Sequence, residues 1–128
     1  MTIAIIDRSE PAALRLGSLV SGIKGVSDII QIIDKEHIME TLNKVMPQVV
    51  LIDVCLNGNE GLINIQKIRE SFPETVIIAL ASSYVTQYRK KCKEIGIEYC
   101  LNKISEFEKI PKIISDIIKH KYKNNNYQ

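Results

Sequence analysis

Short apolar runs alternate along the chain with segments in which apolar residues recur at helical spacing. Runs rich in Ile and Val predict five strands: Ile3–Ile6, Ile29–Ile33, Val49–Ile52, Val76–Leu80 and Ile97–Leu101. The first, third and fourth runs are nearly continuous, which is typical of parallel strands covered on both faces. The segments after the runs place apolar residues three or four positions apart, which predicts a helix after each strand.

This alternation predicts an α/β fold of the type (βα)5. Right-handed crossovers place helices on both faces of a parallel sheet and produce a doubly wound sandwich. For five parallel strands we expect the flavodoxin-like order 2-1-3-4-5. We assign residues 1–122 to one domain and expect the polar residues 123–128 to form a disordered tail.

Residues typical of helix starts support this division. Ser9 and Glu10 stand before Pro11, where the first helix is expected to begin. Asn59, in the polar turn after Asp53, is predicted to cap the third helix.

The composition is that of one soluble domain, with 128 residues, 45% of them hydrophobic and 25% charged. The apolar runs are far shorter than the roughly 20 residues of a membrane helix, and the first residues lack the pattern of a secretory signal. Cys55, Cys92 and Cys100 show no CxxC spacing, so we expect reduced thiols and neither a disulfide framework nor a zinc site. These features predict a cytoplasmic protein without a membrane partner.

The net charge of +2 is unevenly distributed. Residues 1–83 carry 7 Lys/Arg against 10 Asp/Glu, and residues 84–128 carry 10 against 5. A basic end of this kind suits nucleic acid, an acidic protein partner or a solvated helix face. We do not expect nucleic acid, because the other two explanations are commoner.

Charged residues mark the ends of three predicted strands. Asp53 ends the third apolar run, Asp7 follows the first, and Lys103 follows the fifth. The strand order 2-1-3-4-5 places Asp7 beside Asp53, where two carboxylates can hold Mg²⁺. An ammonium group at the same edge can bind phosphate. Together the three residues suit transfer of a phosphoryl group onto Asp53.

The chain resembles the receiver domain of two-component response regulators over about residues 2–120. The segments that carry the resemblance are IAIIDRSEP, PQVVLIDVCLNGNEGL and GIEYCLNK, together with the final EFEKIPKIISDIIK. The third-strand segment is the most specific of these, and its Asp53 takes the position of the family's phosphoacceptor.

The resemblance implies that Asp53 accepts phosphate from a sensor histidine kinase or a phosphotransfer protein. It implies that Lys103 binds the phosphate, and that Mg²⁺ is held by Asp7, Asp53 and the backbone carbonyl of Cys55. Because the chain ends after its fifth helix, we expect a stand-alone receiver that signals to a downstream protein through the fourth helix, fifth strand and fifth helix. The resemblance leaves homodimerisation through the fourth and fifth helices open.

Three positions depart from the family's pattern. Arg8 replaces the second of two consecutive acids after the first strand, which should weaken Mg²⁺ binding. Our hypothesis is that Arg8 partly replaces the charge of the metal by pairing with Asp53. Ala81 stands where the family has a switch hydroxyl, and Cys100 stands where it has the aromatic partner of that hydroxyl. These changes put the family's usual switch in doubt.

The sequence leaves two other classes of function open: a binding module and an independent enzyme. A receiver-like binding module that works without phosphorylation is favoured by Arg8, Ala81 and Cys100 and opposed by Asp53 and Lys103. An independent enzyme is ranked last, although Asp53 could still react with a phosphodonor. An aspartyl phosphatase would need an acid where Cys55 stands, and the nucleotide-binding patterns GxGxxG and GxxxxGK are missing from the sequence.

Overall fold

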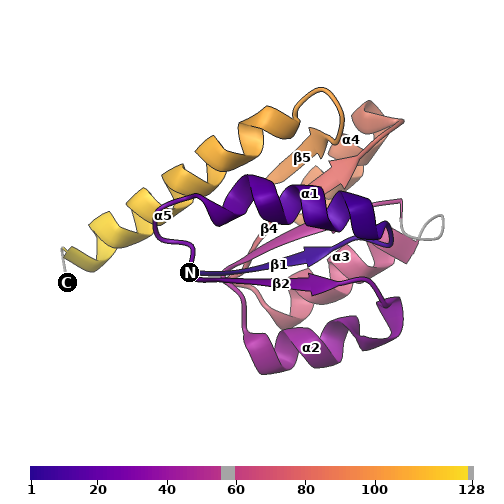
Figure 1. Ribbon diagram of the computed structural model, residues 1–128. Coiled ribbons are helices and arrows are strands. Elements are labelled where there is room, and N and C mark those ends of the chain that lie inside the picture. Colours follow the sequence, from indigo (N-terminus) through magenta and orange to yellow (C-terminus); the bar gives the residue numbers. More distant parts are fainter. Residues whose placement is uncertain (56–59, 127–128) are drawn as a thin grey trace.

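The computed structural model describes residues 1–55 and 60–126, and their side chains except those of Lys35 and residues 121–126. Within these residues the strands form one parallel sheet in the order β2-β1-β3-β4-β5 (Figure 1). The strands are β1 (Thr2–Ile6), β2 (Asp28–Ile32), β3 (Val49–Asp53), β4 (Val76–Ala81) and β5 (Tyr99–Asn102). The predicted fold class and strand order are confirmed.

Helices cover both faces of the sheet. They are α1 (Glu10–Ser21), α2 (Ile38–Val45), α3 (Glu60–Ser71), α4 (Val85–Ile95) and α5 (Ile110–Asn126), with short 3₁₀ turns η1 (Lys35–His37) and η2 (Phe107–Lys109) before α2 and α5. Helices α1 and α5 contribute to one core, and α2, α3 and α4 contribute to the other. None of the helices in the described residues is long and apolar enough to cross a membrane.

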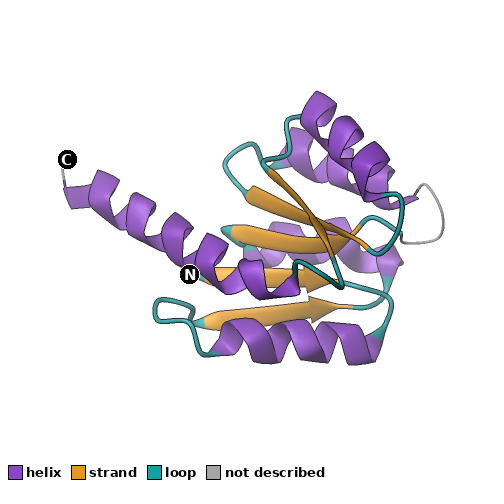
Figure 2. Ribbon diagram, turned by 90° about the horizontal axis from the view of Figure 1, so that it is seen from above, coloured by secondary structure: helices purple, strands orange, loops and turns teal. Residues whose placement is uncertain are grey.

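Helix α5 extends past the start of β1, beyond the edge of the sheet (Figures 1 and 2). Its helical backbone continues to Asn126, past the domain end that we predicted at residue 122. The expected disordered tail is therefore not confirmed for residues 123–126, and residues 127–128 lie outside the described part of the chain.

The central strands alternate their side chains between the two cores. In β3, Val50 and Ile52 pack under α2, α3 and α4, whereas Val49 and Leu51 pack under α1 and α5. All four are fully buried, so a polar residue would be unfavourable on either face. This explains why the sequence of β3 is continuously apolar rather than alternating between apolar and polar residues.

The start of β5 differs from the prediction. The apolar run begins at Ile97, but the strand begins at Tyr99. The Ile97 N–H donates to the Cys92 carbonyl at 2.8 Å and so belongs to the end of α4. Gly96 ends α4 with a φ of +89°, a backbone conformation that would be strained for a residue with a side chain.

The predicted cap of α1 is present. The Ser9 side chain accepts a hydrogen bond from the Ala12 N–H at 3.3 Å, and Pro11 lies in the first turn. This satisfies one of the free N–H groups at the start of the helix. The predicted cap of α3, Asn59, lies outside the described residues.

Gly61 allows α3 to approach the backbone that follows β3. A Cβ atom at position 61 would lie 2.0 Å from the Val54 carbonyl oxygen, far inside van der Waals contact. Val54 is itself fully buried, and its N–H donates to the Leu80 carbonyl at 2.9 Å. The backbone after Asp53 is therefore held between β4 and α3.

We predict that Gly61→Ala lowers the free energy of unfolding by about 3 kcal/mol, because α3 or the Val54 backbone must shift to admit the methyl group. Urea unfolding followed by circular dichroism measures the loss. Gly22→Ala is the matched control, since a Cβ there meets no atom within 4 Å. An equal change in both variants would contradict the steric explanation.

Candidate functional site

The carboxyl ends of β1, β3 and β5 bring three charged residues together. Ile6 of β1 lies opposite Ile52 of β3, so Asp7 and Asp53 follow these partners at the same level of the sheet. Asn102 of β5 lies opposite Ala81, and Lys103 follows it. The parallel register thus places the two acids side by side and directs the lysine toward them.

Lys103 contacts both carboxylates. Its Nζ atom donates to Oδ2 of Asp7 at 2.5 Å and to Oδ2 of Asp53 at 2.8 Å. The side chain of Asp7 is 2% exposed, that of Asp53 16% and that of Lys103 19%. Asp7 is thus shielded from water, whereas Asp53 and Lys103 remain partly accessible to it.

The two carboxylates change the proton affinity of Lys103. Burial disfavours its charged form, but the hydrogen bonds to Asp53 and Asp7 and their negative charges outweigh burial and raise the pKa of Lys103. Lys103 therefore remains an ammonium group throughout the neutral range. Its stabilising effect is present below its unfolded pKa and is lost only as the pH rises through the raised folded pKa.

Backbone N–H groups orient both carboxylates. Oδ1 of Asp7 accepts from the Ser9 N–H at 2.9 Å, and Oδ1 of Asp53 accepts from the Cys55 N–H at 2.8 Å. The remaining oxygens, both Oδ2, meet at the single cation of Lys103. Two carboxylates that already converge on one cation are a donor set that fits Mg²⁺, which prefers oxygen ligands.

Tyr88 is the residue near this site that our reading of the sequence did not assign to it. Burial, the neighbouring Cys55 side chain and the charge of Asp53 raise the pKa of Tyr88, which places its hydroxyl group beside the turn after β3. Tyr88 stands at helical spacing with Val85 and Cys92, and all three pack against the core under α4. This spacing shows that Tyr88 faces the sheet, but it does not show that the hydroxyl group lies near Cys55, because that depends on how α4 packs against the sheet.

The three unusual positions surround the site differently. Ala81 is fully buried at the end of β4, and its carbonyl accepts from the Lys103 N–H at 2.9 Å. Arg8 is exposed at the start of the turn before α1. Cys100 is half-buried in β5 and packs against the core under α4. Its neighbour Tyr99 packs on the other face, as the alternation along a strand requires.

Ion pairs connect the elements beside the site. Arg89 of α4 donates to the Cys100 carbonyl at 3.0 Å and pairs with Glu106, which also accepts from Lys109 at 2.8 Å. The Lys109 ammonium, the Asn102 N–H and the Arg89 charge lower the pKa of Glu106. These contacts tie α4, β5 and η2 into one surface.

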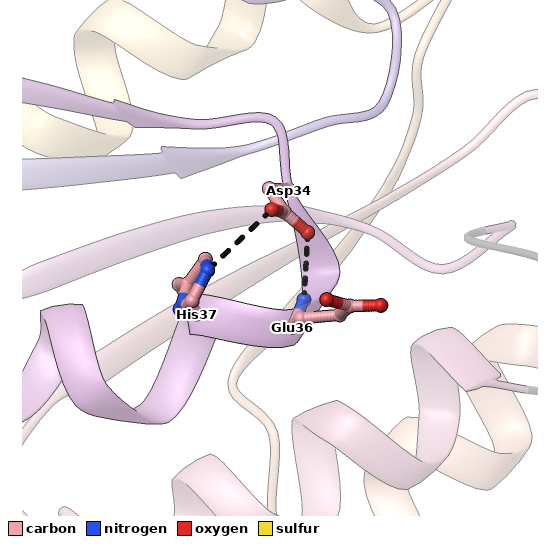
Figure 3. Close-up of side chains that lie close together, drawn as sticks. All are labelled: Asp34, Glu36 and His37. Carbon is pink, nitrogen blue, oxygen red and sulfur yellow. Dashed lines mark hydrogen bonds and ion pairs between the residues drawn. The ribbon is translucent and has the colours of Figure 1, made fainter.

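A second group of ligand-type side chains follows β2. Asp34, Glu36 and His37 lie close together on the surface (Figure 3). Asp34 accepts from the Glu36 N–H at 3.0 Å and lies 3.7 Å from Nε2 of His37. All three residues are exposed, and these contacts are those of a side chain that caps η1.

Residues 3–115 match the family model of the response regulator receiver domain. The fold is similar to the signal receiver domain of a DNA binding response regulator from Colwellia psychrerythraea 34H, with TM-score 0.85, 20% identity, and 93% of this chain and 98% of that chain covered. It is also similar to a response regulator from Thermotoga maritima, with TM-score 0.79, 21% identity, and coverages of 92% and 97%.

A third similar structure is the isolated REC domain of RcsB from Salmonella enterica serovar Typhimurium, with TM-score 0.82, 20% identity, and 94% of this chain and 89% of that chain covered. No curated protein matches the chain in sequence. At these identities the solved structures support the fold, and the family model supports the family.

We predict that Lys103→Met lowers the free energy of unfolding by about 3 kcal/mol at neutral pH, because buried Asp7 and neighbouring Asp53 would lose the ammonium group that pairs with both of them. The loss should shrink as the pH is lowered, since protonation of one carboxyl group removes the repulsion. Urea unfolding at a series of pH values measures both effects.

Lys44→Met is the matched control, because Lys44 pairs with Glu40 on an exposed helix face. Its stability should stay close to that of the unaltered protein at each pH. A similar loss in both variants would show that the position of Lys103 between the two carboxylates is energetically unimportant.

Proposed function

The chain belongs to the family of response regulator receiver domains, and we propose that Asp53 accepts a phosphoryl group from a sensor histidine kinase or a phosphotransfer protein. The observation that carries this proposal is the convergence of Asp7, Asp53 and Lys103. A carboxylate that is partly exposed, oriented by a backbone N–H and adjacent to a cation is suited to attack phosphorus.

In the proposed reaction Oδ2 of Asp53 forms a bond to phosphorus as the bond between phosphorus and the donor's imidazole nitrogen breaks. The donor histidine leaves as imidazole and takes up a proton from solvent. Lys103 transfers its hydrogen bond from the Asp53 carboxylate to an oxygen of the phosphoryl group. Mg²⁺, when bound by Asp7, Asp53 and the Cys55 backbone carbonyl, would neutralise charge on the phosphoryl oxygens.

We propose that the signal leaves through the face formed by α4, β5 and α5. Ala81 offers no hydroxyl group to a phosphoryl group on Asp53, so other contacts must report the change. Two are near: Lys103, which is shared between Asp53 and Asp7, and Tyr88, whose hydroxyl reaches Cys55. The basic side chains of α4 suit a downstream protein with an acidic surface.

The second candidate is a binding module that works without phosphorylation. The observation in its favour is that the resting site is already neutralised to a large extent, because one ammonium group pairs with both carboxylates. The lack of a switch hydroxyl at Ala81 points the same way.

We predict that phosphoramidate with Mg²⁺ adds the mass of one phosphoryl group to the protein, and that Asp53→Asn abolishes this adduct. Intact-mass spectrometry measures the addition. Asp34→Asn is the matched control, because Asp34 also follows a strand of the sheet but lies away from Lys103. This variant should be labelled like the unaltered protein.

The phosphomimetic BeF₃⁻, which has been combined with the isolated REC domain of RcsB, separates the two candidates. Binding of BeF₃⁻ with Mg²⁺ at Asp53, followed by amide chemical shifts, supports the acceptor. Failure of both the adduct and BeF₃⁻ binding would overturn it in favour of the binding module.

We predict that Arg8→Asp raises the affinity for Mg²⁺ about tenfold, because a carboxylate replaces a cation at the residue that follows Asp7. Isothermal titration calorimetry measures the dissociation constant. Lys24→Asp makes the same change of charge in the connection between α1 and β2 and should leave the affinity nearly unchanged. Equal affinities in the unaltered protein and Arg8→Asp would refute the idea that Arg8 weakens the metal site.

A further inference from the structure

Two cysteines meet where α4 packs on β5. Cys92 of α4 is 1% exposed, and Cys100 of β5 is half-buried on the same face of the sheet. Both line a groove of about 470 Å³ between the two elements, together with Arg89, Lys93 and Glu98. The groove gives a small solute a path to the thiols.

The two cysteine side chains share one environment. Cys92 belongs to the core cluster under α4, Cys100 packs against that cluster, and both line the same groove. The backbone around them is firmly held, since the Cys92 carbonyl accepts from the Ile97 N–H at 2.8 Å and the Cys100 carbonyl accepts from Arg89 at 3.0 Å. These hydrogen bonds fix the backbone positions of the two cysteines relative to each other.

Their surroundings make the two thiols chemically different. The neighbouring Cys92 side chain and the positive charge of Arg89 lower the pKa of Cys100, although burial opposes this. The neighbouring Cys100 side chain and burial raise the pKa of Cys92. Cys100 therefore has more thiolate character and better access, and Cys92 is the protonated thiol behind it.

We propose that Cys92 and Cys100 are a site of reversible oxidation, at which a hydroperoxide forms a disulfide that joins α4 to β5. The proposal goes beyond phosphorylation and requires no reaction at Asp53. It rests on the position of both cysteines in one core cluster, the groove that both of them line and the nearby cation of Arg89.

The reaction balances with hydrogen peroxide as the oxidant. The Cys100 thiolate attacks one peroxide oxygen and becomes a sulfenic acid, while the other oxygen leaves as hydroxide. The Cys92 sulfur then attacks the Cys100 sulfur, and the hydroxyl group of the sulfenic acid leaves with the Cys92 proton as water. Two thiols and one peroxide thus become one disulfide and two waters.

The consequence would be a covalent link across the α4–β5 surface. A disulfide holds its two sulfurs about 2.05 Å apart, so its formation would draw the side chains of α4 and β5 together. Once formed, the bond prevents α4 from moving independently of β5. Reduction by a thiol restores the free pair.

The test uses Cys55→Ser, in which Cys92 and Cys100 are the remaining cysteines. After one equivalent of hydrogen peroxide, we expect both thiols to become inaccessible to alkylation in denaturant and the mass to fall by two hydrogen atoms. Trypsin cleavage after Lys91, Lys93 and Lys103 should release residues 92–93 linked to residues 94–103. Dithiothreitol should separate these peptides.

Two further variants in the same background assign the roles. With Cys92→Ser, Cys100 should be trapped as a sulfenic acid by dimedone; with Cys100→Ser, oxidation of Cys92 should be about tenfold slower than that of Cys100. Peptide mapping of the unaltered protein repeats the test if a variant fails to fold. No oxidation, an intermolecular disulfide, a disulfide to Cys55, or an oxidised Cys100 beside a free Cys92 would overturn the proposal.

Discussion

The ammonium group of Lys103 holds two carboxylates together at the carboxyl edge of the sheet, and the arrangement of the strands serves this contact. Neighbouring strands lie about 4.8 Å apart, so the ends of β3 and β5 are separated by about 10 Å. The lysine side chain, its 2.8 Å hydrogen bond and the side chain of Asp53 together bridge this distance past the end of β4, which carries the small residue Ala81. Without that cation the nearly buried Asp7 would lose the ammonium group with which its Oδ2 atom pairs.

Helix α4 connects this edge to the rest of its surface. Near its middle Tyr88 reaches Cys55, one position later Arg89 binds β5 and Glu106, and one turn further Cys92 lies beside Cys100. Residues of one helix thus contact the turn after β3, the strand β5 and Glu106, which precedes η2. A displacement of α4 would therefore alter all of these contacts together.

The sequence was sufficient to predict the order of strands in the sheet and the charged residues at its carboxyl edge. Buried runs identified the strands, and parallel order followed from their alternation with helices, so the meeting of Asp7, Asp53 and Lys103 could be predicted from topology alone. The start of β5 could not be predicted, because an apolar residue such as Ile97 is equally compatible with the end of a helix and the beginning of a strand. The contacts of Tyr88 and of Cys92 with Cys100 depend on how α4 lies against the sheet, which spacing along one element does not encode.

The close approach of Gly61 to Val54 has a consequence for how such a chain can change over generations. Because the helix cannot pack unless the turn after Asp53 keeps its course, selection for a folded protein alone would preserve that turn. A descendant could lose phosphotransfer and still display the backbone of an acceptor site. A retained backbone at this edge of the sheet is therefore weaker evidence for retained phosphotransfer than the presence of the Asp53 carboxylate itself.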